Sequence, residues 1–126
     1  MNKKLNIIYQ LYEELVNKAT KIFEQNKENW LTQEREMEIN FDSIIKPTEY
    51  VNRIVTIKQE IKNVLRKPKN LNTEIIVKYL DIHIKRLNRI KENLAINNLG
   101  TNVNILSYLF DDMLLFFKRN NMVVVK

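Results

Sequence analysis

Apolar residues recur at three- and four-residue spacing in four separate segments of the chain. These segments are residues 3–26, 48–67, 73–97 and 102–120. The spacing places the apolar side chains of each segment on one helix face, so each segment predicts an amphipathic α-helix. The four segments together cover most of the chain, which predicts a mainly helical protein.

Two residues mark where helices are expected to stop. Pro68 ends the second predicted helix, because the residue before a proline is pushed out of the α region. Gly100 is the expected stop of the third helix, as the left-handed residue of a C-terminal cap. The links after residues 67 and 98 are short and favour antiparallel neighbours. We therefore expect an all-α, single-domain antiparallel four-helix bundle over residues 1–126.

The connector between the first two predicted helices has a different pattern. Residues 36–42 alternate polar and apolar with period two, which predicts a strand. A strand needs a backbone partner, and the β-favouring run at residues 122–125 supplies one, so we expect a short two-stranded β patch. Two alternatives stay open: an irregular connector that plugs the bundle, and pairing of strand edges in a homodimer.

The fourth predicted helix is apolar over most of its circumference. Such a helix is either central in the core or carries an extra contact surface, with Phe116 and Phe117 as candidate interface residues. Trp30 in the connector is either a core plug or an interface anchor. On the third predicted helix, Ile75, Ile82 and Ile84 widen the apolar core stripe.

The composition excludes most kinds of catalytic site. The chain has no cysteine and only one glycine, which rules out thiolate chemistry, cysteine zinc sites and glycine-rich phosphate loops. The single histidine, His83, lies on an apolar stripe and is expected to be a hydrogen-bonded core or rim residue. Asp111 and Asp112 lack further ligands at metal spacing, so they form a polar helix edge or face the basic helix. We expect no enzyme activity, no metal and no cofactor.

The sequence predicts neither a signal peptide nor a membrane span. The residues after Lys3 and Lys4 are too few and too polar for a signal peptide, and the apolar stretch 105–117 is shorter than the ~20 residues of a span. We expect a cytoplasmic protein, or a host-intracellular one if it is viral. The 18 asparagines and 16 isoleucines have AT-rich codons and indicate an AT-rich genome or a mobile element.

Positive charge is concentrated in one part of the chain. The net charge is +6, and residues 58–91 alone hold 10 basic and 3 acidic residues. Lys58, Lys62 and Arg66 follow one another at four-residue spacing with no acid four residues away, so like charges repel on one helix face. A polyanion would relieve that repulsion. The expected contacts to nucleic acid or an acidic partner are Lys58, Lys62, Arg66, Lys67, Lys69, Lys85, Arg86 and Arg89.

The acidic residues of the third predicted helix indicate two local ion pairs. Glu74 precedes Lys78 by four residues, and Asp81 precedes Lys85 by the same spacing. The function that this sequence predicts is a non-catalytic helical binding module whose basic face contacts a nucleic-acid backbone or an acidic partner. The alternative is a protein-interaction module, an adaptor, inhibitor or assembly subunit of a larger complex, that uses the apolar fourth helix or the acidic connector.

Overall fold

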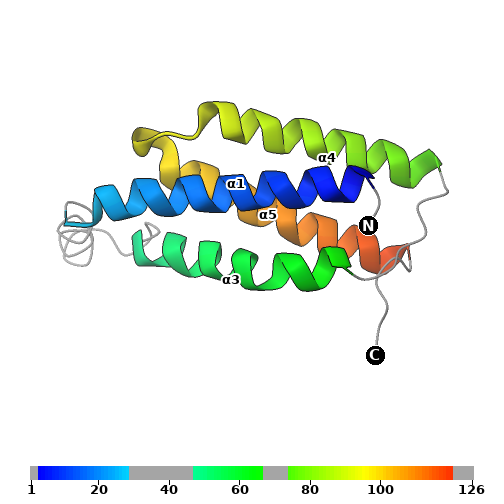
Figure 1. Cartoon of the computed structure of the whole chain (residues 1–126), viewed down its shortest axis with the longest axis horizontal. Coiled ribbons are helices and arrows are strands. Elements are labelled where there is room, and N and C mark those ends of the chain that lie inside the picture. Colours follow the sequence, from blue (N-terminus) through cyan, green and yellow to red (C-terminus); the bar gives the residue numbers. More distant parts are fainter. Residues whose placement is uncertain (1–2, 29–46, 67–73, 121–126) are drawn as a thin grey trace.

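The computed structural model describes residues 3–28, 47–66 and 74–120. Its helices are α1 (Lys3–Gln25), α3 (Pro47–Arg66), α4 (Glu74–Asn93) and α5 (Leu99–Arg119), and the short 3-10 helix η1 (Ile96–Asn98) joins the last two (Figure 1). The predicted all-α four-helix bundle is confirmed. The predicted β patch, residues 36–42 with 122–125, lies outside the described residues, and so does Trp30.

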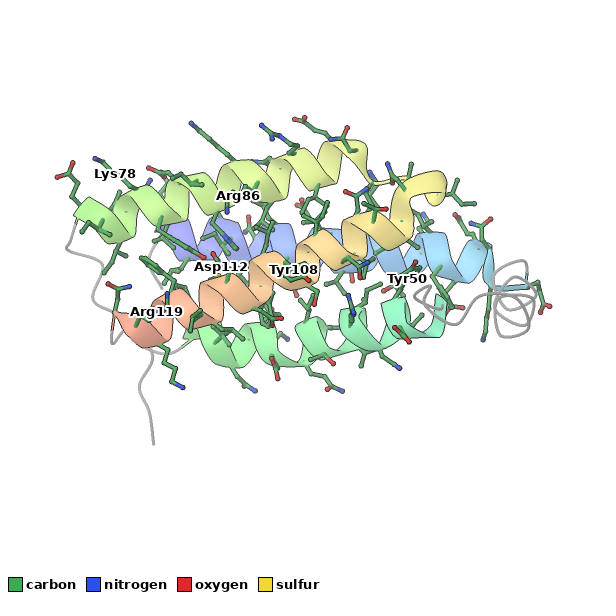
Figure 2. The ribbon with its side chains drawn as sticks, turned by 180° about the vertical axis from the view of Figure 1, so that it is seen from behind. Tyr50, Lys78, Arg86, Tyr108, Asp112 and Arg119 are labelled. Carbon is green, nitrogen blue, oxygen red and sulfur yellow. The ribbon has the colours of Figure 1, made fainter. Side chains whose placement is uncertain are left out.

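The helices pack around the core in the order α1, α3, α5, α4 (Figure 1, Figure 2). Successive helices alternate in direction, as their links predict. However, α3 and α4 occupy diagonally opposite corners although they follow each other in sequence. The neighbours α1 and α4 therefore run parallel, as do α3 and α5. The groove between α1 and α3 consequently lies on the opposite side of the bundle from the groove between α4 and α5.

Two ion pairs join the parallel helices α1 and α4. Lys4 pairs with Asp81, and Glu14 pairs with Lys91. Both pairs join residues 77 positions apart in the sequence. A constant offset between two helices means that they rise together in the same direction, so these contacts fix the register of the pair.

Gly100 does not end α4 as predicted, because α4 ends at Asn93 and Gly100 lies in the first turn of α5. The chain reverses around Asn98, whose side chain accepts a hydrogen bond from the Ala95 backbone (2.8 Å) and donates one to the Asn93 carbonyl (2.6 Å). These bonds satisfy backbone groups near the helix ends. Position 100 needs a glycine for a different reason, since a Cβ there would overlap the ring of Tyr50 on α3.

Each helix contributes one apolar stripe to a shared core. The largest fully buried side chains include Tyr12 of α1 and Phe110 of α5, whose rings meet edge to face with centroids 5.5 Å apart. Among the described residues, the buried polar side chains are His83 and Asn102. The Asn102 amide donates to the Asn98 carbonyl at 3.1 Å. His83 lies next to the groove between α4 and α5.

Candidate functional site

The predicted basic residues divide between two sides of the bundle. Lys58 and Lys62 are exposed on α3 and border the groove between α1 and α3. Arg86 and Arg89 are exposed on α4 and border the groove between α4 and α5, on the opposite side. In the described part of the chain, the charge that is contiguous in sequence therefore does not form one continuous face.

The rest of the predicted basic run on α3 lies outside the described residues. This applies to the side chain of Arg66 and to Lys67 and Lys69. Lys58 and Lys62 form no ion pair with any residue that the structure describes. Their two charges are therefore not neutralised within the described bundle.

The two ion pairs predicted within α4 have different outcomes. Glu74 and Lys78 pair at 3.2 Å, which confirms the first. The prediction of a pair between Asp81 and Lys85 is wrong, because Asp81 pairs instead with Lys4 of the parallel helix α1. Lys85 is consequently exposed on α4 with no ion pair to a described residue.

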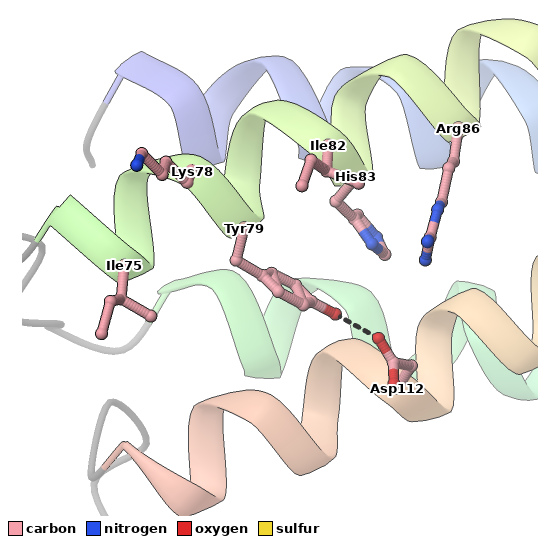
Figure 3. Close-up of a pocket in the computed structure, with 7 residues that line it drawn as sticks. All are labelled: Ile75, Lys78, Tyr79, Ile82, His83, Arg86 and Asp112. Carbon is pink, nitrogen blue, oxygen red and sulfur yellow. Dashed lines mark hydrogen bonds between the residues drawn. The ribbon is translucent and has the colours of Figure 1, made fainter.

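Two cavities lie in the groove between α4 and α5. The first, about 370 Å³, is bordered by Tyr79, His83 and Asp112 among others (Figure 3). The second, about 380 Å³, is bordered on its α5 side by residues that include Ile105. Arg86 borders both cavities, so its side chain lies where they meet. Apolar atoms form most of both walls, which is typical of sites that take apolar groups.

A polar network lies at the first cavity, where His83 is buried and the hydrogen bond between Tyr79 and Asp112 is exposed. His83 is 1% exposed, and its Nε2 lies 2.7 Å from the Tyr12 hydroxyl. The Tyr79 hydroxyl donates to the Asp112 carboxylate at 2.8 Å and so ties α4 to α5 (Figure 3). The Tyr79 ring also stacks on His83 and on Phe116, with centroids 5.7 and 3.8 Å away. The prediction that His83 is a hydrogen-bonded core residue is confirmed.

The surroundings set the protonation states of this network. Burial lowers the pKa of His83 to about 4, an effect that Asp112 opposes and Arg86 reinforces. Burial raises the pKa of the Tyr12 hydroxyl. Burial, together with the hydrogen bond to Asp112, also raises the pKa of Tyr79. At pH 7 the imidazole is therefore neutral and both hydroxyls keep their protons, so these three groups offer hydrogen bonds rather than an ionised nucleophile.

Exposed apolar side chains gather on the two helices that form this groove. Of the eight large apolar residues exposed in the described ranges, five lie on α4 or α5: Ile75, Ile82, Ile105, Tyr108 and Leu115. Ile75 is 71% exposed and Tyr108 75%, and Tyr108 lies on the near side of α5 in Figure 2. Ile75 and Ile82, which were predicted to widen the core stripe of α4, are exposed rather than buried. Both occupy the edge of the α4 stripe that faces the open groove.

The two phenylalanines predicted as interface residues lie mainly inside the bundle. Phe117 is fully buried, so it cannot contact a partner without opening the core, and the structure contradicts that assignment. Phe116 is half-buried against Tyr79. The apolar surface of α5 is instead formed by residues that the sequence analysis did not single out, with Tyr108 the most exposed.

No protein-family model, curated protein or solved structure matches this chain. None of the described helices is long and apolar enough to cross a membrane. Within the described ranges, no three histidine, cysteine, aspartate or glutamate side chains are grouped so that they could hold a metal ion.

Proposed function

We propose that this chain is a non-catalytic binding module that holds an acidic protein partner on the side formed by α4 and α5. The α4–α5 face is defined as Ile75, Ile82, Arg86, Arg89, Ile105, Tyr108 and Leu115. One observation carries the proposal: the same two cavities are bordered by exposed apolar side chains, Ile75, Ile82 and Ile105, and by Arg86 and Arg89, which form no ion pair with a described residue. We place this binding in the cytoplasm, or inside the host cell if a mobile element encodes the chain.

The apolar part of the face supports a protein partner. Apolar surface gains about 25 cal/mol for each Å² removed from water, and contiguous apolar patches on a monomer usually mark interaction sites. Tyrosine and arginine are enriched at protein interfaces, and Tyr108 on α5 is the most exposed large apolar residue that the structure describes. Arg86 and Arg89 form no ion pair with a described residue, so an acidic partner would neutralise them.

A site-specific photocrosslinking experiment tests this proposal. A photoreactive phenylalanine analogue replaces Tyr108, and the matched control places it at Val55, which is 43% exposed on α3. In cells that make the protein, position 108 should yield a discrete protein adduct that survives nuclease, and position 55 should not. Ile105→Glu should abolish the adduct by placing a charge in the face. Equal adducts from both positions, or adducts destroyed by nuclease, would contradict the proposal.

A second candidate function is contact with a nucleic-acid backbone through α3. It is favoured by Lys58 and Lys62, which are exposed without an ion pair to a described residue on the side opposite the α4–α5 face. Changing Lys58, Lys62 and Arg66 to glutamine should weaken binding to any duplex alike and lower the salt slope by about one per lost contact. Arg86→Gln serves as the control. Unchanged binding by the triple variant would eliminate this candidate.

A further inference from the structure

We infer that the partner presents an acidic amphipathic α-helix to the α4–α5 face, with one apolar side chain in each cavity and a carboxylate between them. This inference rests on the proposed function and specifies the chemistry of the occupant. It is carried by three properties of the groove: the spacing of its cavities, the absence of a free backbone edge in its walls, and the placement of its charges.

The two cavities are spaced as side chains on a helix are spaced. Along α4 the first cavity extends over residues 75–86 and the second over residues 86–93, so their midpoints are about nine residues or about 13 Å apart. On α5, Asp112 borders the first cavity and residues 102–109 the second, a separation of about 10 Å. Side chains seven or eight positions apart on a helix share one face and lie about 10 to 12 Å apart.

The walls of the groove favour a helix over an extended peptide. Both walls are α-helices, whose backbone groups are already hydrogen-bonded within α4 and α5. An extended peptide needs a sheet edge to satisfy its own backbone, and these walls offer none. A helix satisfies its backbone internally and contributes only side chains, so it can dock in a groove of this kind.

The charges of the groove favour an acidic helix. Arg86 lies where the two cavities meet, and Arg89 borders the second, so a carboxylate between the two apolar anchors can reach both guanidinium groups. Asp112 borders only the first cavity, where the Tyr79 hydroxyl already donates to it. Lys78, Arg86 and Arg89 outnumber Asp112 along the groove, so net like-charge repulsion disfavours a second copy of this chain docked face to face.

A small panel of synthetic peptides tests the inference on the full chain. The probe is a helical peptide of about 18 residues, based on alanine and glutamine, with two leucines seven positions apart and a glutamate four positions after the first. One control has the same composition with the leucines five positions apart, on different faces. A second control has lysine in place of the glutamate. Calorimetry measures the dissociation constants.

His83 supplies an independent readout of where a peptide binds. It is the only histidine in the chain, and it borders the first cavity, so its ring signals in NMR spectra report occupation of that cavity. We expect the probe to shift these signals and to bind about tenfold or more tightly than either control. Arg86→Gln with Arg89→Gln should remove the preference for glutamate over lysine. Lys58→Gln with Lys62→Gln, on the other side, should change nothing.

Several results would overturn the inference. If the probe and the control with altered leucine spacing bind equally, the spacing does not determine binding. If the probe and the lysine control bind equally, the charge does not determine binding. Binding without a change at His83 would place the peptide elsewhere, and a concentration-dependent dimer strengthened by Arg86→Gln would identify a second copy as the occupant. If no peptide binds while the crosslink from position 108 persists, the helical occupant is wrong and the proposed function stands. Loss of both would refute both.

Discussion

Replacing Tyr12 and His83 together should cost less stability than the sum of the two single replacements. The side chains meet in the core between α1 and α4, 2.7 Å apart, and neither is more than 1% exposed. Tyr12→Phe leaves the imidazole without its partner, and His83→Leu leaves the hydroxyl without its partner. The double variant removes both polar groups and fills the site with apolar side chains of similar size.

The expected magnitudes follow from this burial. Each single replacement should lower the free energy of unfolding by about 2 kcal/mol, because a buried polar group without a partner costs about 1–3 kcal/mol. The double variant should lose about 1 kcal/mol, since replacing both partners by apolar groups is nearly neutral. The coupling free energy is then about 3 kcal/mol, well above the roughly 0.3–0.5 kcal/mol expected for independent sites.

Urea unfolding followed by the far-ultraviolet dichroism of the helices measures these values. The dependence on urea should be the same for all variants, so that midpoints report stability directly. Tyr12→Phe combined with Val55→Ala, an exposed position on α3, serves as the control pair and should be additive. A double Tyr12→Phe, His83→Leu variant that loses the full sum of about 4 kcal/mol would refute the reasoning, because the two groups would then not be partners.

Three further predictions concern His83, Gly100 and Asp81. The pKa of His83 is about 4 in the folded chain and near 6.5 when unfolded, so only the unfolded chain takes up a proton between these values. The free energy of unfolding, measured by urea titration, should therefore be highest above pH 6.5 and fall by about 2 kcal/mol from pH 7.5 to pH 5. His83→Leu should remove this pH dependence. Gly100→Ala should lower the melting temperature by displacing Tyr50, whereas in a Tyr50→Ala background it should be neutral or stabilising, since alanine is the better helix former. Asp81→Asn should cost less than about 1 kcal/mol in urea unfolding, because its ion pair with Lys4 is partly exposed; a larger loss would show that the pair does more than fix register.

Periodicity alone predicts the four helices and the burial of His83, because a helix must turn its apolar stripe inward. It does not predict which stripes meet. The apolar stripes of α3 and α4 are buried equally well whether the two helices occupy adjacent or diagonal corners of the bundle. The sequence of neither helix distinguishes these two arrangements. This is why Lys58 and Arg86 lie on opposite sides of the bundle although both belong to the basic region at residues 58–91. For the same reason, the pairing of Asp81 with Lys4 has no signal within α4.

Part of the α4–α5 face could be predicted from the sequence. Ile75 and Ile82 are seven residues apart at the edge of the α4 stripe, and Arg86 follows on the same side. Leu80 and Leu87, at the centre of the same stripe, are part of the packed interior. The exposure of Tyr108 had no signal in the sequence, because it depends on which sides of α5 the neighbouring helices cover.

The diagonal placement of α3 and α4 divides the molecule into two helical hairpins of contiguous sequence, α1 with α3 and α4 with α5. The contacts of Tyr12 with His83, Lys4 with Asp81 and Arg53 with Asn104 all cross from one hairpin to the other. Cleavage between the hairpins would thus leave two fragments with complementary polar and apolar surfaces. The two fragments could therefore reassemble into the bundle. Two intact copies could likewise exchange hairpins, with the α1–α3 hairpin of one copy packing against the α4–α5 hairpin of the other.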